Sequence, residues 1–216
     1  MQEIFPGILK SVKKLYTKNL VKGSVYGEEI MKKNGIEYRE WNPTRSKLGA
    51  ALMKGLKENP IKKELKILYL GASTGTTVSH VSDIIEKEGI IYAIEFAERM
   101  IRKLVNLAEK RKNIVPLLAD ARKPEDYYWV EECDIAYVDL AQPDETEIAI
   151  RNAEYFNCKY IMIAIKSQSI DVTKKPEQVY IEEKAKLERS GFNVIELIDI
   201  EPYEHDHCFI VAKKLL

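Results

Sequence analysis

The sequence predicts an α/β fold in which a mostly parallel sheet is covered by helices on both faces and ends in an antiparallel hairpin. A small β-rich unit precedes the sheet. From Leu65 onward, short apolar runs alternate with amphipathic segments, which is typical of parallel strands buried on both faces. The last two apolar runs have no helix between them, and the first forty residues lack a long helical repeat.

The composition fits one chain with a core of ordinary size. Its 216 residues are 45% hydrophobic and 31% charged, so neither disulfides nor a metal is needed to hold it together. Basic and acidic side chains number 34 each, yet residues 1–60 hold 12 basic against 6 acidic ones. This asymmetry suits an enzyme that grips a phosphate backbone locally, and the overall balance argues against an indiscriminate nucleic-acid binder.

No targeting or anchoring segment is expected. The apolar runs are far shorter than the roughly 20 residues of a membrane span, and the N-terminus lacks a signal-peptide pattern. Cys133, Cys158 and Cys208 are odd in number and widely spaced, which fits neither a disulfide framework nor a zinc site. We therefore expect a soluble, intracellular protein of the cytoplasm.

The N-terminal segment is expected to form a small antiparallel unit of strands and turns. Its β-forming runs are Phe5–Leu9, Leu15–Asn19 and Ser24–Gly27. Apolar side chains then recur at helical spacing and predict a helix over Ser46–Leu56, which Pro60 closes. We place a domain boundary there, with residues 1–57 in the small domain and residues 58–216 in the sheet domain.

The elements of the sheet domain alternate along the chain. Strands are predicted at Lys66–Leu70, Ile90–Glu95, Ile114–Leu118, Ile135–Asp139 and Tyr160–Lys166. Helices are predicted at Thr77–Ile85, Ala97–Lys110, Glu145–Tyr155 and Val179–Ser190. The closing hairpin comprises Asn193–Ile200 and His207–Ala212. Five crossover strands and a terminal hairpin resemble the Rossmann-like, seven-stranded sheet of class I S-adenosylmethionine-dependent methyltransferases.

A glycine turn follows the first strand of this sheet. Ligands of open α/β sheets bind beyond the carboxyl ends of the strands, where Gly71 and Gly75 allow a close backbone approach. Thr76 and Thr77 can present hydroxyls and N–H groups at a helix start. The turn matches neither a Walker A loop nor the GxGxxG dinucleotide motif. Taken alone, it is equally consistent with an ordinary strand-to-helix turn.

Three acidic side chains close the next three strands. Glu95 can accept hydrogen bonds from both hydroxyls of a ribose, and Asp120 can help to read an adenine edge. Asp139 ends the fourth strand. Acids on three successive strand ends beside a glycine turn indicate a nucleoside site. Because no phosphate-binding motif is present, S-adenosylmethionine is favoured over NAD.

Lys166 closes the fifth strand and has two interpretations. It can extend harmlessly into solvent, or it can form a charge pair with Asp139 on the neighbouring strand end. A lysine held there can stabilise a developing alkoxide or accept the proton of a ribose hydroxyl. His205 and His207 begin the last strand, but two histidines without a third spaced ligand favour no metal site.

Several longer strings together resemble the fibrillarin family of RNA 2′-O-methyltransferases, over essentially the whole chain. They are Arg39–Leu48, Tyr69–His80, Tyr92–Phe96, Tyr137–Pro143, Ile165–Asp171 and Glu201–His207. The resemblance implies a compact, archaeal-type enzyme that uses S-adenosyl-L-methionine to methylate ribose in ribosomal RNA. It leaves transfer RNA open as a second substrate.

The resemblance also implies the site residues. Cofactor contacts are expected from Gly71, Ala72, Thr76, Thr77, Glu95, Phe96, Asp120, Ala121, Asp139 and Gln142. The expected catalytic cluster comprises Asp139, Lys166, Lys47 and His207. Two positions stay open, Arg45 against Lys47 and Glu201 against His207. The expected reaction is an in-line displacement in which Asp139 holds Lys166 while Lys166 promotes deprotonation of the 2′-OH.

The implied partners are a box C/D guide RNA, the target RNA, a Nop-domain scaffold protein and a kink-turn-binding subunit resembling a ribosomal protein. Neither a metal nor a membrane is implied. A small-molecule or protein methyltransferase is an alternative, which predicts an apolar or acidic substrate mouth. A catalytically silent nucleoside-binding subunit and a dinucleotide dehydrogenase are the others, and retention of both Asp139 and Lys166 speaks against the silent subunit.

Overall fold

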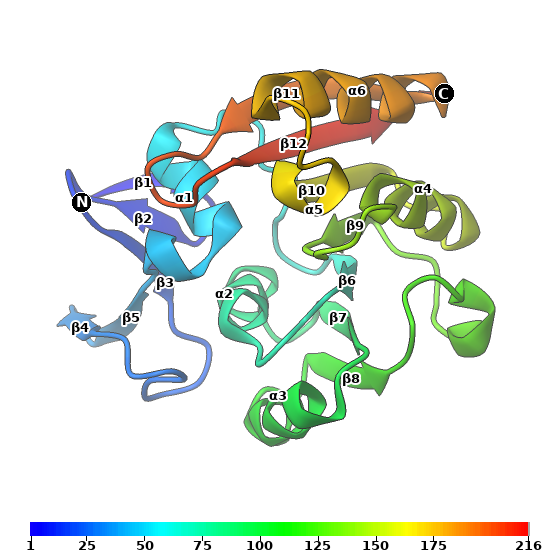
Figure 1. The fold of residues 1–216 in the computed structure, drawn as a ribbon. Coiled ribbons are helices and arrows are strands. Elements are labelled where there is room, and N and C mark those ends of the chain that lie inside the picture. The colour runs from blue at the N-terminus through cyan, green and yellow to red at the C-terminus, as the bar shows by residue number, and fades with distance from the viewer. Residues whose placement is uncertain (216) are drawn as a thin grey trace.

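The computed structural model describes residues 1–215 and contains two sheets (Figure 1). The N-terminal sheet is antiparallel throughout, in the order β1-β2-β3-β5-β4. Its strands are β1 (Gln2–Phe5), β2 (Ile8–Lys10), β3 (Leu15–Lys18), β4 (Ile30–Lys33) and β5 (Ile36–Glu40). The small antiparallel unit is thus confirmed.

Two of the β runs expected in that unit were wrongly placed. Phe5–Leu9, expected as one run, spans the turn at Pro6 and Gly7 between β1 and β2. Ser24–Gly27, expected as a β run, lies in bends between β3 and β4. The strands that complete the sheet instead form a hairpin that turns at Asn34 and Gly35, both with positive φ. Positive φ at two consecutive residues is typical of the two-residue turn that suits the twist of a hairpin.

The large sheet has the order β11-β12-β10-β9-β6-β7-β8. Its parallel strands are β6 (Lys66–Leu70), β7 (Ile90–Glu95), β8 (Ile114–Leu118), β9 (Ile135–Val138) and β10 (Tyr160–Lys166). The closing hairpin is β11 (Phe192–Asp199) and β12 (His207–Lys214), and β12 is antiparallel to both neighbours. The predicted strands and hairpin are confirmed, although β9 ends one residue before Asp139. Because β6 lies between β7 and β9, the strand order reverses at β6.

The predicted helices are confirmed to within three residues at each end. The helical elements are η1 (Pro43–Arg45), α1 (Lys47–Lys54), α2 (Thr76–Ile85), α3 (Glu98–Lys110), η2 (Pro124–Tyr127), α4 (Glu145–Tyr155), α5 (Ser167–Ile170) and α6 (Pro176–Arg189). The side chain of Ser46 caps the start of α1, and Gly55 ends that helix with a φ of 98°. Within residues 1–215, no helix has the length and apolarity that a membrane crossing needs.

Side chains of the large sheet alternate between two apolar clusters. Ile67 and Tyr69 of β6 belong to the cluster that includes α1, α2, α3 and the N-terminal sheet. Leu68 and Leu70 belong to the cluster that includes α4 and α6. This period of two places helices on both faces, as the apolar runs predicted. Because the first cluster also contains residues of the N-terminal sheet, the boundary between residues 57 and 58 crosses a shared core and stays a prediction.

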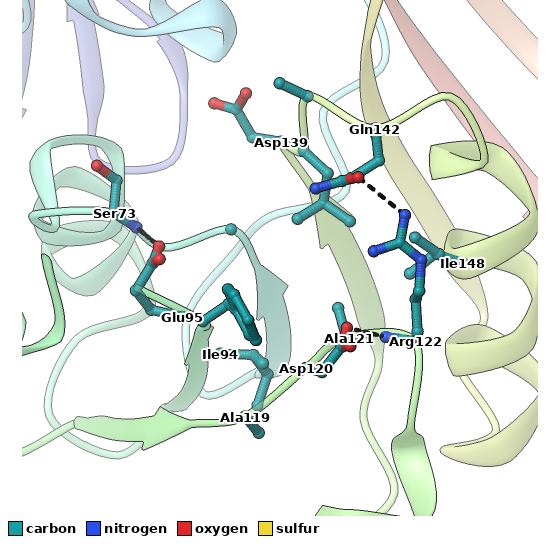
Figure 2. A pocket seen from close by; sticks show the side chains of 14 residues that line it. Ser73, Ile94, Glu95, Ala119, Asp120, Ala121, Arg122, Asp139, Gln142 and Ile148 are labelled. Carbon is teal, nitrogen blue, oxygen red and sulfur yellow. Dashed lines mark hydrogen bonds between the residues drawn. The ribbon is translucent and has the colours of Figure 1, made fainter. Parts of the chain in front are cut away.

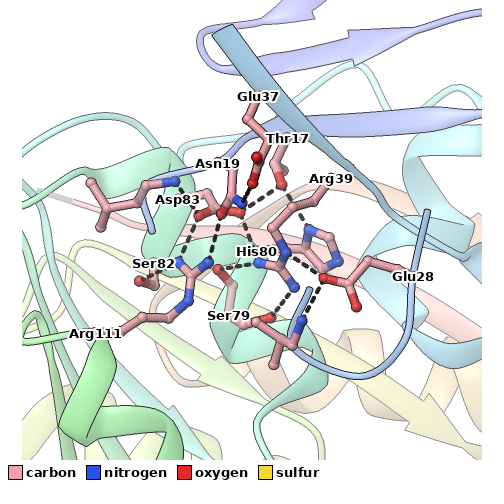
Figure 3. Close-up of polar contacts among 12 residues, drawn as sticks. Thr17, Asn19, Glu28, Glu37, Arg39, Ser79, His80, Ser82, Asp83 and Arg111 are labelled. Atoms are coloured by element: carbon pink, nitrogen blue, oxygen red, sulfur yellow. Dashed lines mark hydrogen bonds and ion pairs between the residues drawn. The ribbon is translucent and has the colours of Figure 1, made fainter. Parts of the chain in front are cut away.

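A buried ionic cluster joins the small sheet to α2 (Figure 3). Asp83 of α2 contacts the guanidinium of Arg39 from β5 at 2.9 Å and that of Arg111, which follows α3, at 2.6 Å. Glu28 provides a further carboxylate for Arg39 at 2.5 Å. Burial lowers the pKa of the neighbouring His80 well below its ordinary value, so the imidazole is neutral and joins Thr17 and Tyr26 by hydrogen bonds. The start of α2 is therefore fixed relative to the N-terminal sheet.

We predict that Asp83→Ala destabilises the fold by about 3–5 kcal/mol, because it leaves two buried guanidiniums without their shared carboxylate. Denaturant-induced unfolding measures this loss. Glu88→Ala, which removes an exposed partner of Lys87, is the matched control and is expected to change stability little. Equal effects of the two substitutions would show that the cluster does not stabilise the fold.

Candidate active site

The site lies where the strand order reverses, between the ends of β6 and β9. Gly71 follows β6 with a φ of 82°, and a Cβ atom there would lie 2.2 Å from the backbone carbonyl oxygen of Asp139. The N–H of Asp139 donates to the carbonyl of Leu70 at 3.0 Å. Only glycine allows this close approach of the two chains. The glycine turn therefore fixes the position of Asp139, rather than merely connecting a strand to a helix.

A cavity of about 300 Å³ opens on one side of Asp139, and we call it the acidic cavity. Figure 2 shows Glu95, Asp120 and Asp139 around it, each at or just beyond a strand end. The two carboxylate oxygens of Glu95 accept hydrogen bonds from the N–H groups of Ser73 and Ala97, both at 2.7 Å. Since each carboxylate oxygen has a second acceptor site, Glu95 can still accept from hydroxyls of a ligand.

The rim of the acidic cavity contains a residue that the sequence did not reveal. Arg122 donates to Gln142 at 2.8 Å (Figure 2), and it pairs with Asp144 at 2.7 Å. The N–H of Arg122 also donates to Asp120 at 2.9 Å. Arg122 therefore fixes two predicted cofactor residues at once. It lies in a loop without periodicity, and only its spacing of two from Asp120 could have signalled it.

A second cavity, of about 380 Å³, opens on the other side of Asp139, and we call it the lysine cavity. Asp139, Lys166, Lys47 and His207, the four predicted catalytic residues, all line it. Lys47 Nζ lies 2.7 Å from Asp139 Oδ1. Burial alone would lower the pKa of Lys47, but the charge and the hydrogen bond of Asp139 raise it above its ordinary value. Lys47 is thus held as an ammonium.

The prediction of a charge pair between Asp139 and Lys166 is wrong. β9 and β10 are neighbours, as predicted, but among the described residues the ion pair of Asp139 is formed with Lys47 from α1. Helix α1 comes from the N-terminal part of the chain, so no strand pattern could place its first residue. Lys166 lines the same cavity from the end of β10.

The structure places the alternative residues for the two open positions of the catalytic cluster differently. Arg45 also lines the lysine cavity, but its guanidinium lies over the ring of Tyr26, 4.7 Å from the centroid, while Lys47 contacts Asp139. Glu201 is not part of the cavity wall, whereas His207 and an acid that was not predicted, Glu204, are.

His207 stands opposite Lys166 in the antiparallel pairing of β12 with β10. Its Nδ1 lies 2.6 Å from the carbonyl oxygen of His205, so Nδ1 carries the ring proton and donates a hydrogen bond to that oxygen. Burial lowers the pKa of His207, and the charges of Lys47 and Lys166 act in the same direction. A neutral His207 therefore keeps an unprotonated Nε2. Within the described part of the chain, no three His, Cys, Asp or Glu side chains gather as a metal site.

The predicted cofactor residues divide between the two cavities. Those that line the acidic cavity are Gly71, Glu95, Phe96, Asp120, Ala121, Asp139 and Gln142. Those that line the lysine cavity but not the acidic cavity are Ala72, Thr76 and Thr77. The hydroxyl of Thr77 donates to Ser46 at 2.9 Å, so it joins the start of α2 to the start of α1.

A buried carboxyl group contacts the backbone of Lys166 behind the wall of the lysine cavity. Glu145 at the start of α4 is fully buried, and its Oε1 accepts the N–H of Lys166 at 3.2 Å. Its Oε2 has no hydrogen-bond partner among residues 1–215. Burial raises the pKa of Glu145 well above its ordinary value, and the nearby charges of Asp139 and Glu183 raise it further. Sequence reasoning missed Glu145, because an acid in the first turn of a helix is an ordinary feature.

The strand order, the glycine turn and the acidic strand ends define this fold as that of a class I methyltransferase. The fibrillarin family model matches residues 1–215, and the chain belongs to the fibrillarin family. A relative from Sulfurisphaera tokodaii, the fibrillarin-like rRNA/tRNA 2′-O-methyltransferase, is 55% identical over 204 residues, which cover 93% of this chain and 88% of the relative.

Two solved structures are similar over most of their length. Aeropyrum pernix fibrillarin in complex with natively bound S-adenosyl-L-methionine is 48% identical with a TM-score of 0.85, covering 92% of this chain and 88% of that one. A fibrillarin/Nop5p complex contains a chain that is 40% identical with a TM-score of 0.91, covering 99% of this chain and 100% of that one.

We predict that Glu145 makes stability fall as the pH rises above the ordinary glutamate pKa of about 4.3. The carboxyl group of Glu145 binds its proton more tightly in the folded state than in the unfolded chain. Its protonation therefore stabilises the fold below the unfolded pKa, and this contribution is lost as the pH rises toward the higher pKa of the folded state. Glu145→Gln should remove that part of the pH dependence in denaturant titrations run at several pH values. Glu147→Gln, two residues along α4 and half-exposed, is the control. A wild-type pH profile retained by Glu145→Gln would contradict the assignment.

Proposed function

We propose that this chain is an S-adenosyl-L-methionine-dependent RNA 2′-O-methyltransferase that modifies ribosomal RNA and transfer RNA. Membership in the fibrillarin family supports the activity, and the names of its relatives, rRNA/tRNA 2′-O-methyltransferases, support both RNA classes. The observation that carries the proposal is the position of Asp139 between an acidic cavity and a cavity lined by two lysines and a histidine. One cavity suits a nucleoside donor and the other suits a ribose acceptor.

The acidic cavity fits the cofactor. Glu95 and Asp120 supply carboxylates for ribose hydroxyls and an adenine edge, and Phe96 exposes an aromatic ring beside them. Gly71 lines the same cavity and, without a side chain, lets the end of β6 approach Asp139 closely. When bound, S-adenosyl-L-methionine supplies an activated methyl group on a sulfonium centre. Gln142, fixed by Arg122, is a further polar group of this wall.

The lysine cavity holds and deprotonates the acceptor hydroxyl. In this proposal the ammonium groups of Lys47 and Lys166 lower the cost of negative charge on the 2′-oxygen, and Asp139 orients Lys47. The Nε2 of His207 is available to receive the proton, because Nδ1 is already a donor to His205. Lys166 thus retains the role expected from the sequence, while its positioning comes from β10 and Glu145 rather than from Asp139.

The chain would act as the catalytic subunit of a box C/D ribonucleoprotein particle. A Nop-domain scaffold protein is the partner with direct support, because a similar fibrillarin has been crystallised with Nop5p. A guide RNA that pairs with the target and a kink-turn-binding subunit complete the proposed particle. The cytoplasm is the proposed compartment, which is consistent with three buried cysteines that form no disulfide.

The basic character of the acceptor side separates this proposal from its alternatives. A small-molecule or protein methyltransferase was expected to have an apolar or acidic substrate mouth, whereas Arg45, Lys47 and Lys166 line the lysine cavity. A silent nucleoside-binding subunit would have no need for the ion pair of Lys47 with Asp139.

We predict that Lys166→Ala binds S-adenosyl-L-methionine with wild-type affinity but loses methyl transfer by at least about a hundredfold, the range expected for an acid–base or oxyanion-stabilising group. Calorimetry measures cofactor binding, and ribose-methylation mapping in a particle reconstituted with guide RNA and both partners measures transfer. Lys159→Ala, which changes an exposed lysine just before the other end of β10, is the matched control. Wild-type turnover by Lys166→Ala would exclude Lys166 from the chemistry.

A further inference from the structure

A third hollow, larger than both cavities at about 470 Å³, adjoins the lysine cavity, and its role is not explained by the cofactor or the acceptor ribose. We call it the basic groove, and its charged wall residues are Lys22, Arg45, Lys103, Lys110 and Arg111. No Asp or Glu lines it among the described residues. Arg111 is already neutralised by Asp83, so four cations remain.

The charges of these four cations are not neutralised by a carboxylate of the described chain. Within residues 1–215, Lys22, Arg45, Lys103 and Lys110 have no ion-pair partner, and all four are exposed. Many other basic residues of this chain do pair with a neighbouring carboxylate, including Lys63 and Lys66. Unpaired cations around a hollow without acids create a positive field that attracts an extended anion.

The basic groove is continuous with the lysine cavity. Arg45, Thr74 and Thr76 line both, so the two hollows meet at the start of α2. Arg45 lies over the ring of Tyr26, which also lines the groove. A chain that places one sugar in the lysine cavity therefore has a route past Arg45 into the groove.

The groove also has the length of an extended strand rather than of a single anion. Lys103 and Lys110 stand two helical turns apart on α3, a separation of about 10 Å. Lys22 lies in the segment between β3 and β4, and Arg45 lies in η1. Cations from three separate elements thus line one hollow.

The acidic cavity on the far side of Asp139 would repel phosphates, so the charges leave one favourable direction for the backbone of a polynucleotide.

We propose that the basic groove holds the phosphate backbone of the RNA strand next to the ribose that is methylated. This inference rests on the proposed function and adds a path for the substrate. The contacts are to phosphates, because the charged wall residues of the groove are all cations, so the groove binds without reading sequence. Selection of the nucleotide is left to base pairing with the guide.

The test uses the assembled particle with guide RNA and partners, because the target strand reaches this chain there. The double variant Lys103→Gln/Lys110→Gln removes two groove cations. The control Arg99→Gln/Arg102→Gln removes two exposed cations from the same helix that are not part of the groove wall. Single-turnover methylation is measured with saturating cofactor and with particle in excess over a trace of target RNA, at particle concentrations below saturation and over a range of salt concentrations. Cofactor affinity is measured separately.

The groove variant should methylate about tenfold more slowly than wild type at low salt, and its salt slope should be shallower by about 1.5, as expected for two lost phosphate contacts on a single strand. Its cofactor affinity should be unchanged, and the control should match wild type. A groove variant that matches the control in rate and slope overturns the proposal.

Two further outcomes separate the possible failures. If wild-type particles transfer no methyl group to ribose, the proposed function itself fails, whatever the variants do. If Lys103→Gln/Lys110→Gln prevents particle assembly in native gels but leaves the rate of assembled particles unchanged, the groove binds an acidic protein surface, and the RNA path is overturned. A photoreactive uridine beside the target nucleotide should crosslink to α3 in wild type and lose that crosslink in the groove variant.

Discussion

The ion pair between Lys47 and Asp139 is the contact on which the site depends. Its two members come from opposite parts of the chain, one from the first turn of α1 and one from the end of β9. Asp139 cannot shift, because its carbonyl oxygen lies where a side chain on Gly71 would be. The backbone of Lys47 is also fixed, because the side chain of the preceding Ser46 caps α1 and accepts a hydrogen bond from the hydroxyl of Thr77 at the start of α2. The pair therefore defines the border between the acidic cavity and the lysine cavity.

This arrangement makes the geometry of the site depend on the N-terminal part of the chain. The buried cluster of Arg39, Asp83 and Arg111 fixes α2 against that sheet, and α2 begins beside the glycine turn. The N-terminal part also supplies Lys47 to the acceptor side and Lys22 and Arg45 to the basic groove. Three of the twelve basic residues in the first 60 positions, Lys22, Arg45 and Lys47, thus lie on one side of Asp139. The acids that close β7 and β8 lie on the other side.

Much of the fold was predictable because local pattern and tertiary environment agree. Apolar runs such as Ile67–Leu70 are buried on both faces, so their composition reveals parallel strands directly. The hairpin at Asn34–Gly35 was missed because its strands are short and partly exposed, and their polar residues conceal the alternation. The β run Ser24–Gly27 failed for the opposite reason, since β-forming residues occur there without a partner strand.

The residues at the strand ends were predictable, but their pairing was not. Parallel strands bring their carboxyl ends to one edge, so Glu95, Asp120 and Asp139 had to lie close together. Which lysine reaches Asp139 depends on how α1 packs across the shared core, and this is a long-range contact that leaves no periodic signal. Glu145 and Arg122 were missed for the same reason, because each acts through a residue distant in sequence.

The central claim is that Lys47 and Asp139 act as one unit, and a double-mutant cycle on the rate of methyl transfer at saturating cofactor tests it most directly. Lys47→Ala, Asp139→Asn and the double variant are compared in the reconstituted particle. If the pair is a unit, the double variant is no slower than the slower single variant, because the second change removes nothing further. If the losses of the two single variants multiply in the double variant, the residues act independently, and the ion pair is not the organising contact of the site.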